Sequence, residues 1–148
     1  MIISNTAMTA PAFLFLVLIL RLFINMIIRS MKIAWLTGGR TDRDWVKQGL
    51  DIYVSRLKHY IPFSINEIPE LKNVSAMSRD QIKAKEGELI LKSIKPTDDV
   101  ILLDEHGKEY SSTEFASLLQ NKINYEGKDI VFVIGGAYGF SEQVYKRA

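Results

Sequence analysis

A run of five apolar residues followed by a glycine-rich loop constrains this sequence most. Ile130 to Ile134 are mostly β-branched or aromatic, which is typical of a parallel strand buried on both faces. Gly135 and Gly136 then turn the chain. Ser141 with Glu142 indicates a helix start, because serine caps free backbone amides and glutamate suits the positive helix end. A strand, a glycine loop and a helix start in this order predict a small-molecule site at the carboxyl edge of an α/β sheet.

The glycine loop by itself does not say what it would bind. The segment Gly135–Gly139 lacks the spacing of the dinucleotide fingerprint, and no Gly-Lys-Ser/Thr follows that would make it a phosphate loop. Glycines after a strand are also common in tight turns that bind nothing. The ligand therefore has to be inferred from other parts of the sequence.

The polar residues argue against several kinds of site. The 148 residues include no cysteine, which excludes disulfides, thiolate metal ligands and a cysteine nucleophile. The two histidines, His59 and His106, lie far apart in sequence, so neither a metal centre nor a histidine-based triad is supported. Because Arg21 and Arg29 are the only charged residues among the first 30, the remaining residues carry 17 basic and 17 acidic side chains. Any RNA contact would therefore use a local patch or a recognised shape.

Residues 1–30 differ in composition from the rest of the chain. Only Arg21 and Asn25 interrupt an apolar run from Ala12 to Ile28, which is long enough for a marginal membrane helix but carries a charge near its centre. No basic residue precedes the run, which argues against a secretory signal. We interpret this hydrophobic N-terminal extension either as upstream sequence, with the true start at Met31, or as a membrane anchor that holds the rest in the cytoplasm.

Strand and helix patterns alternate from residue 31 onward. Apolar or alternating segments predict strands over 32–37, 63–68, 99–104 and 130–134. Apolar residues at helical spacing predict helices after Asp44, after Ser78 and after Ser111 or Ser112, and a last one opens at Ser141. Thr41 has the capping-box spacing to Asp44 at the first of these helices, and Gly127 is expected to end the third. This order predicts an α/β fold, with a mostly parallel sheet flanked by helices.

Two of the predicted strands end in segments that can form one crevice. Leu103 and Gly135 stand at these ends, and parallel strands place their carboxyl ends at the same edge of the sheet. Their main-chain groups could bind the edge of an adenine ring. Basic residues around the first strand-to-helix turn form the better candidate for an anion or RNA contact: Arg40, Arg43 and Lys47. The charged residues Lys83, Lys85, Glu86 and Glu88 are expected to form a solvated helix face.

Several segments together resemble the RlmH family of SPOUT-class methyltransferases. The match runs in register from Met31 to Ala148, and the segments that carry it are Met31–Ile33, Tyr53–Tyr60, Lys85–Glu88, Leu102–Lys108, Ser111–Ser112 and Phe132–Gly139. The family methylates N3 of a pseudouridine in large-subunit (23S) ribosomal RNA, and its α/β fold ends in a trefoil knot. The resemblance thus implies a methyltransferase with S-adenosyl-L-methionine as cofactor, no metal, a cytoplasmic location and a homodimer.

The resemblance also assigns roles to individual residues. It implies that Leu103 and Gly135 contact the cofactor, while Gly136 and Gly139 let the backbone come close to it. The chemistry would be direct methyl transfer to a deprotonated ring nitrogen, which requires positioning and loss of a proton. No residue is identified as the proton acceptor.

Members of the family continue beyond the position that matches Ala148. The further segment supplies the rest of the cofactor pocket, the knot and much of the dimer interface. We therefore expect the domain over 31–148 to be incomplete at its C-terminus, to bind the cofactor weakly or not at all, and to expose apolar surface. The alternatives are a non-catalytic truncated fragment, a membrane-anchored cytoplasmic module that uses residues 1–30, and an unrelated nucleotide-binding α/β module.

Overall fold

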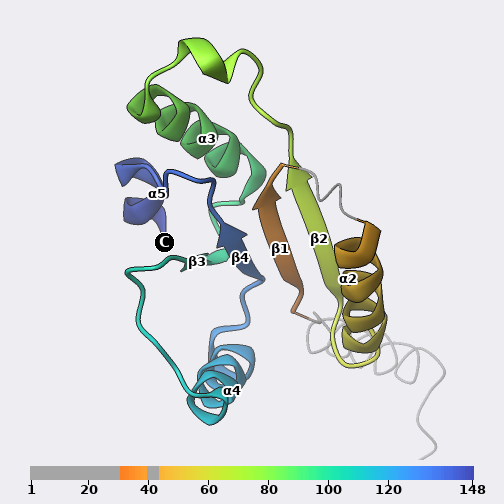
Figure 1. Cartoon of the computed structure of the whole chain (residues 1–148). Coiled ribbons are helices and arrows are strands. Elements are labelled where there is room, and N and C mark those ends of the chain that lie inside the picture. Colours follow the sequence, from red (N-terminus) through yellow and green to blue (C-terminus); the bar gives the residue numbers. More distant parts are fainter. Residues whose placement is uncertain (1–30, 40–43) are drawn as a thin grey trace, which may run out of the picture. The chain divides into compact units, whose positions relative to one another are not determined.

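The computed structural model describes residues 31–39 and 44–148, which belong to one compact unit, Met31–Ala148. At the centre of this unit is a four-stranded sheet in the order β2-β1-β4-β3, in which every pair of neighbours is parallel (Figure 1). The strands are β1 (Ile33–Gly38), β2 (Phe63–Ile68), β3 (Asp99–Leu103) and β4 (Ile130–Ile134). The predicted α/β fold with a mostly parallel sheet is confirmed.

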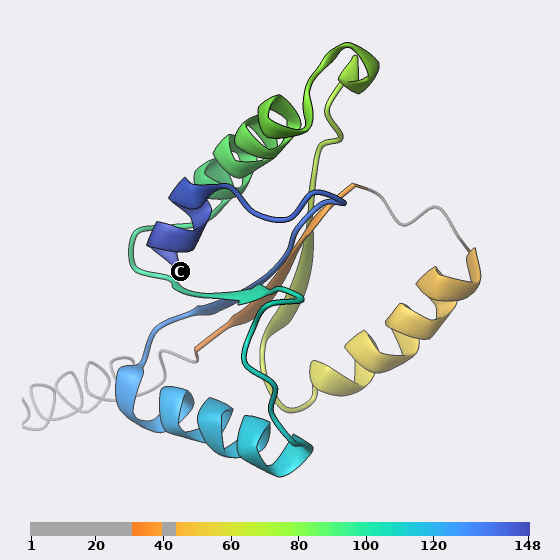
Figure 2. The same ribbon diagram turned by 60° about the vertical axis from the view of Figure 1, so that its left-hand side comes forward.

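Helices cover both faces of this sheet. One face carries α3 (Arg79–Ser93) and α5 (Glu142–Arg147), and the other carries α2 (Asp44–Leu57) and α4 (Ser112–Asn121) (Figure 2). A short 3-10 turn, η1 (Val74–Ala76), precedes α3, and a π-helical turn, η2 (Lys122–Glu126), extends α4. Gly127 ends that turn with φ 61°, in agreement with its predicted role as a helix terminator.

The central strand β4 supplies side chains to two hydrophobic clusters. Val131 and Val133 point to the face under α3 and α5, where they pack with Leu36, Ile90 and Val144. Ile130 and Phe132 point to the other face. Because alternate residues of a strand face opposite sides, a strand that is apolar at every position is buried only between two layers.

Side-chain caps begin two of the helices as the sequence predicts. Ser78 and Gln81 form a reciprocal capping box at the start of α3, and Ser111 and Glu114 form one at the start of α4. The predicted cap at the start of the last helix is wrong in one respect. Ser141 stands at the N-cap of α5, but its side chain makes no capping bond, and its Oγ is buried without a partner among the described residues.

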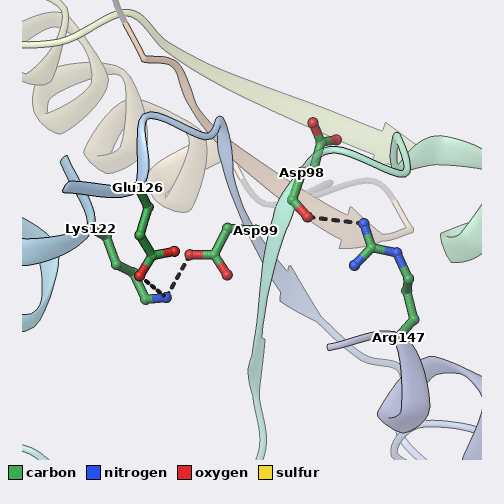
Figure 3. A network of polar contacts seen from close by, with 5 residues as sticks. All are labelled: Asp98, Asp99, Lys122, Glu126 and Arg147. Carbon is green, nitrogen blue, oxygen red and sulfur yellow. Dashed lines mark hydrogen bonds and ion pairs between the residues drawn. The ribbon is translucent and has the colours of Figure 1, made fainter. Parts of the chain in front are cut away.

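A network of polar contacts fixes the amino end of β3 (Figure 3). Nη2 of Arg147 donates to the carbonyl oxygens of Lys95 at 2.7 Å and Asp98 at 2.9 Å, which ties α5 to the loop before β3. Lys122 Nζ lies 2.6 Å from Oδ2 of Asp99. This hydrogen bond raises the pKa of Lys122, so the stability that the pair contributes is present at neutral pH and is lost only as pH rises past the raised pKa.

Helix α3 touches α5 at a glycine. A methyl group on Gly87 would overlap Oγ of Ser141 and would lie 3.0 Å from Ser141 Cβ and 3.4 Å from Val144 Cγ2. Gly87 is itself buried, and Val144 is fully buried. The absence of a side chain at Gly87 therefore sets how closely α5 approaches α3.

None of the helices within residues 31–39 and 44–148 is long and apolar enough to cross a membrane. The proposed anchor in residues 1–30 lies outside the described residues, and so does the predicted Thr41 cap of α2. The interpretation of residues 1–30 as an N-terminal extension stays a prediction.

Replacing Gly87 by alanine is expected to destabilise the fold. Alanine gains about 1 kcal/mol of helix propensity, but overpacking of a close contact costs about 1–3 kcal/mol, so the net loss should be about 1 kcal/mol. The matched control is Gly49→Ala on α2, where nothing lies within 4 Å of the added methyl group. This control should gain about 0.5–1 kcal/mol. Urea unfolding measures both values, and equal stabilisation by the two substitutions would contradict the tight contact.

Candidate active site

The strand registers bring the carboxyl ends of β1, β3 and β4, with the glycine loop that follows β4, to one edge of the sheet. Leu103 pairs with Ile134, and Ile134 pairs with Thr37, so that β1, β3 and β4 end at the same level. The glycine loop follows Ile134 directly. Two cavities open at this edge, one on the β3 side of the loop and one on the β1 side.

The larger cavity, which we call the β3-side cavity, has a volume of about 630 Å³. It combines the end of β3, the whole glycine loop and the first turns of α3 and α5. Its walls are Arg79, Asp80, Lys83, Leu103–His106, Gly135–Phe140 and Tyr145. The predicted cofactor residues Leu103, Gly135, Gly136 and Gly139 all line this one cavity, as expected from their positions at strand ends and in the loop.

Two of these glycines are required by the shape of the loop. Gly139 has φ +76°, a conformation that costs a residue with a side chain about 1–2 kcal/mol. A methyl group on Gly135 would lie 3.0 Å from two ring atoms of Phe140, which is itself buried. The loop therefore keeps its backbone exposed to the cavity and packs its one phenylalanine inward.

A hydrogen bond joins the end of β3 to α5 at the wall of the β3-side cavity. The hydroxyl of Tyr145 donates to Oδ2 of Asp104, and the ring of Tyr145 packs edge-on against Phe140 with centroids 5.8 Å apart. The bond from Tyr145, together with a backbone bond from His106, lowers the pKa of Asp104. The same bond raises the pKa of Tyr145. Asp104 is therefore more than a solvated turn residue, because it holds α5 over the cavity.

Charges of both signs line the β3-side cavity, and the α3 wall carries two basic residues with one acid, Asp80. Arg79 and Lys83 are one helical turn apart on α3, and the guanidinium of Arg79 lies 5.7 Å from the ring centroid of Tyr138. Asp104 and Glu105 face from the end of β3. A ligand that carries both a positive and a negative group would meet complementary partners here.

The smaller cavity, which we call the β1-side cavity, has a volume of about 280 Å³ and shares Gly136 with the larger one. Glu86 reaches into the space beside this glycine, so that a methyl group on Gly136 would lie 2.5 Å from Oε2 and 2.8 Å from Oε1 of Glu86. Its Oε2 is buried and has no hydrogen-bond partner among the described residues. Burial raises the pKa of the Glu86 carboxyl.

The placement of Glu86 corrects the sequence interpretation. We expected Lys83, Lys85, Glu86 and Glu88 to form one solvated face, but Glu86 lies on the inner side of α3. The signal was present in the sequence, because Ile82, Glu86 and Ile90 are four residues apart and therefore share a face, and both isoleucines are buried. Tyr145 could not have been found in this way, since it meets Asp104 from 41 positions along the chain.

The predicted RNA contacts are placed only in part. Lys47 is exposed on α2 and borders a third hollow, with Trp35 and Asp51, which includes Ile134 but no residue of the glycine loop. Arg40 and Arg43 lie outside the described residues, so their grouping with Lys47 stays a prediction. Within residues 31–39 and 44–148, no three histidine or acidic side chains come together as a metal ion would need.

Comparison with known proteins identifies the class of this domain. The family described as "Predicted SPOUT methyltransferase" matches residues 31–148. The chain is 49% identical over 118 residues to the ribosomal RNA large subunit methyltransferase H of Parabacteroides distasonis, and 51% identical over 118 residues to that of Bacteroides thetaiotaomicron. Each match covers 80% of this chain and 75% of the relative. The chain therefore belongs to the SPOUT methyltransferase family, and the predicted family is confirmed.

Membership of the SPOUT methyltransferase family limits the functions that the two cavities can have. It excludes the alternative of an unrelated nucleotide-binding module, since the matched region contains both strand ends and the whole glycine loop. The matched relatives are named as methyltransferases that act on ribosomal RNA of the large subunit. A methyltransferase requires a donor site and an acceptor site side by side, and this edge of the sheet offers two adjoining cavities.

Replacing Tyr145 by phenylalanine tests the bond that closes the β3-side cavity. Without the hydroxyl donor, the pKa of Asp104 should rise toward its ordinary value. A group with a lowered folded pKa stabilises the fold above its unfolded pKa and loses that contribution as pH falls through the folded pKa. The stability difference between the two proteins should therefore be present at pH 7 and shrink in acid. Carboxyl carbon NMR and urea unfolding at several pH values measure both effects.

The control for this prediction is Tyr125→Phe. Tyr125 is 84% exposed and lies on the π-helical turn, away from the site. It should change neither the pKa of Asp104 nor the pH dependence of stability. An unchanged Asp104 titration in Tyr145→Phe would show that the hydrogen bond does not act on this carboxylate.

Proposed function

We propose that this protein transfers a methyl group from S-adenosyl-L-methionine to N3 of a pseudouridine in large-subunit (23S) ribosomal RNA. One observation carries the proposal: Leu103, Gly135, Gly136 and Gly139 line a single cavity at the carboxyl edge of the sheet. The names of the relatives supply the class of acceptor, and the resemblance of the sequence to the RlmH family supplies the nucleoside.

The residues of the β3-side cavity fit a nucleoside cofactor. Its volume of about 630 Å³ lies within the range of about 300–1,000 Å³ that is usual for small-molecule pockets. The glycine loop presents backbone without side chains, which lets a flat adenine ring approach the ends of β3 and β4. Arg79 and Lys83 can pair with a carboxylate, and Asp104 and Glu105 can face an ammonium group. These are the charges of a methionine moiety.

The protein contributes mainly position to such a reaction. The bound cofactor supplies an activated methyl group, and direct transfer needs the acceptor atom in line with it. Tyr145, which bonds Asp104 and packs against Phe140, fixes α5 against the end of β3, so the walls of the β3-side cavity keep their positions.

The partners of the domain follow from the same proposal. The basic group Arg40, Arg43 and Lys47 would contact the phosphates of the RNA, because a net-neutral domain needs a local cationic patch to bind it. We place the methyltransferase domain at residues 31–148, with residues 1–30 as a separate extension, and we assign the domain to the cytoplasm, where ribosomal RNA is modified.

We further propose that the domain acts as a homodimer and that α2 forms part of the interface, beside the part that the resemblance assigns to the family's further segment. No residue of α2 is buried, and large apolar side chains stand exposed on it: Trp45, Ile52, Tyr53 and Leu57. The helix also carries both acidic and basic residues, which suits contact with a second copy of itself. Exposed apolar patches of this kind usually mark an interface.

Replacing Ile52 by glutamate should convert the dimer into a monomer. Ile52 is 54% exposed, so the substitution should leave the fold of the monomer intact while placing a charge in the interface. Light scattering during size-exclusion chromatography measures the mass. The control Gln48→Glu adds the same charge at an exposed polar position of α2 and should remain dimeric. A monomeric unsubstituted chain would contradict the proposed assembly.

Replacing Gly139 by alanine tests the cofactor site. The substitution strains the loop at φ +76° and should weaken binding of S-adenosylhomocysteine, the reaction product, about tenfold, or about 1.4 kcal/mol. The matched control is Gly127→Ala, which has a similar φ of +61° but lies outside the cavity. Both variants should lose about 1 kcal/mol of stability, but only Gly139→Ala should bind less tightly. Titration calorimetry measures the binding.

Two outcomes would count against the proposed function. Equal affinity of both variants for S-adenosylhomocysteine would remove the glycine loop from the cofactor site. Failure of the unsubstituted chain both to bind S-adenosylhomocysteine and to transfer labelled methyl groups to unmodified large ribosomal subunits would favour the alternative of a non-catalytic fragment.

A further inference from the structure

The β1-side cavity has the size and the walls of a site for one aromatic ring. Its volume of about 280 Å³ is just below the usual range for drug-sized ligands, so it suits a single base better than a whole nucleotide. Apolar side chains from β2, α3 and β4 form its walls: Ile68, Leu89, Ile90 and Ile134. Apolar walls of this kind make favourable contacts with the two faces of a flat ring.

The charged side chains that line the β1-side cavity are both carboxylates. Glu70 and Glu86 are the charged residues that line it, and no described lysine, arginine or histidine does so. The described walls of this cavity therefore offer acceptors for a ring with N–H groups and no cation for a phosphate or carboxylate. The β3-side cavity differs, because Arg79 and Lys83 line it.

Glu86 lacks the partner that a buried carboxylate requires. Its Oε2 is inaccessible and accepts no hydrogen bond from the described residues. Leaving a buried polar group unpaired costs about 1–3 kcal/mol, and a catalytic role is one of the reasons why a protein retains such a group. The raised pKa of this carboxyl also makes it a better proton acceptor than an ordinary glutamate.

Gly136 is the wall that the two cavities share. The carboxylate of Glu86 packs against it from the β1 side, and the β3-side cavity opens on its other side. An acceptor ring in the β1-side cavity and a methyl donor in the β3-side cavity would therefore both border on Gly136. A side chain at position 136 would separate them.

We propose that the β1-side cavity receives the methyl-accepting pyrimidine base and that Glu86 is the catalytic residue that takes the proton from its ring nitrogen. This inference rests on the proposed function. The N–H bond breaks and the proton passes to the carboxylate of Glu86. The ring nitrogen then uses the freed electron pair to bond the methyl carbon, while the carbon–sulfur bond of the donor breaks and its electrons stay on sulfur, which becomes a neutral thioether.

Replacing Glu86 by glutamine tests the proton acceptor. Glutamine keeps the size of the side chain but cannot take the proton, so methyl transfer to ribosomal RNA should fall about 100-fold or more. Binding of S-adenosylhomocysteine should stay within about twofold, because Glu86 does not line the β3-side cavity. The matched control is Glu88→Gln, an exposed position on the same helix, which should retain full activity. Activity within threefold of the unsubstituted enzyme in Glu86→Gln would overturn the role of Glu86.

A binding measurement tests the cavity without activity. Pseudouridine nucleoside, titrated into the labelled chain saturated with S-adenosylhomocysteine, should shift the amide NMR signals of Gly38, Gly39 and Leu89. It should not shift those of Glu105 and His106, which line only the β3-side cavity. Shifts confined to other residues, or none, would overturn the base site whatever the activity. Nucleoside shifts at the β1-side cavity without methyl transfer would support the base site and count against the proposed function alone.

Discussion

The position of β4 between β1 and β3 is the constraint on which the rest of the domain depends. Both edges of this strand are hydrogen-bonded to parallel neighbours, and both faces lie under helices. A strand paired on both sides cannot shift without breaking the hydrogen bonds to both neighbours. The carboxyl end of β4 is therefore held at a fixed position relative to β1 and β3. The glycine loop therefore emerges beside Leu103 on one side and Thr37 on the other. Both cavities follow from that placement.

Helix α3 contacts the segment from Gly136 to Val144 at two glycines. Each close contact is possible only because one of the two residues that meet is a glycine. Gly87 of α3 admits Ser141 and Val144, which brings α5 against the core. Gly136 of the loop admits the carboxylate of Glu86. These contacts use neighbouring residues of α3, so the helix that closes the core also delivers the buried acid. The packing of α5 on the core and the position of the Glu86 carboxylate therefore both depend on α3, and a change in the angle of this helix would alter both.

Local sequence signals predicted much of this domain. The strands, the two capping boxes at Ser78 and Ser111, and the helix terminator Gly127 each depend on residues within a few positions of one another. The same reasoning failed at Ser141 and at Glu86. Serine before a helix usually caps it, but the side chain of Ser141 is pressed against Gly87 instead. A charged run usually faces water, but Glu86 shares its side of α3 with two buried isoleucines.

The sequence alone determined the class of fold, the edge of the sheet where the predicted cofactor residues gather, and the family to which the chain belongs. Alternating periodicities define elements, and parallel strands send their ends to one side, so these conclusions need no coordinates. Tertiary structure alone decided that Tyr145 reaches Asp104, that one carboxylate oxygen of Glu86 is buried beside Gly136, and that two cavities share this glycine. These contacts join residues from distant parts of the chain, and their distances depend on how the helices pack against the sheet.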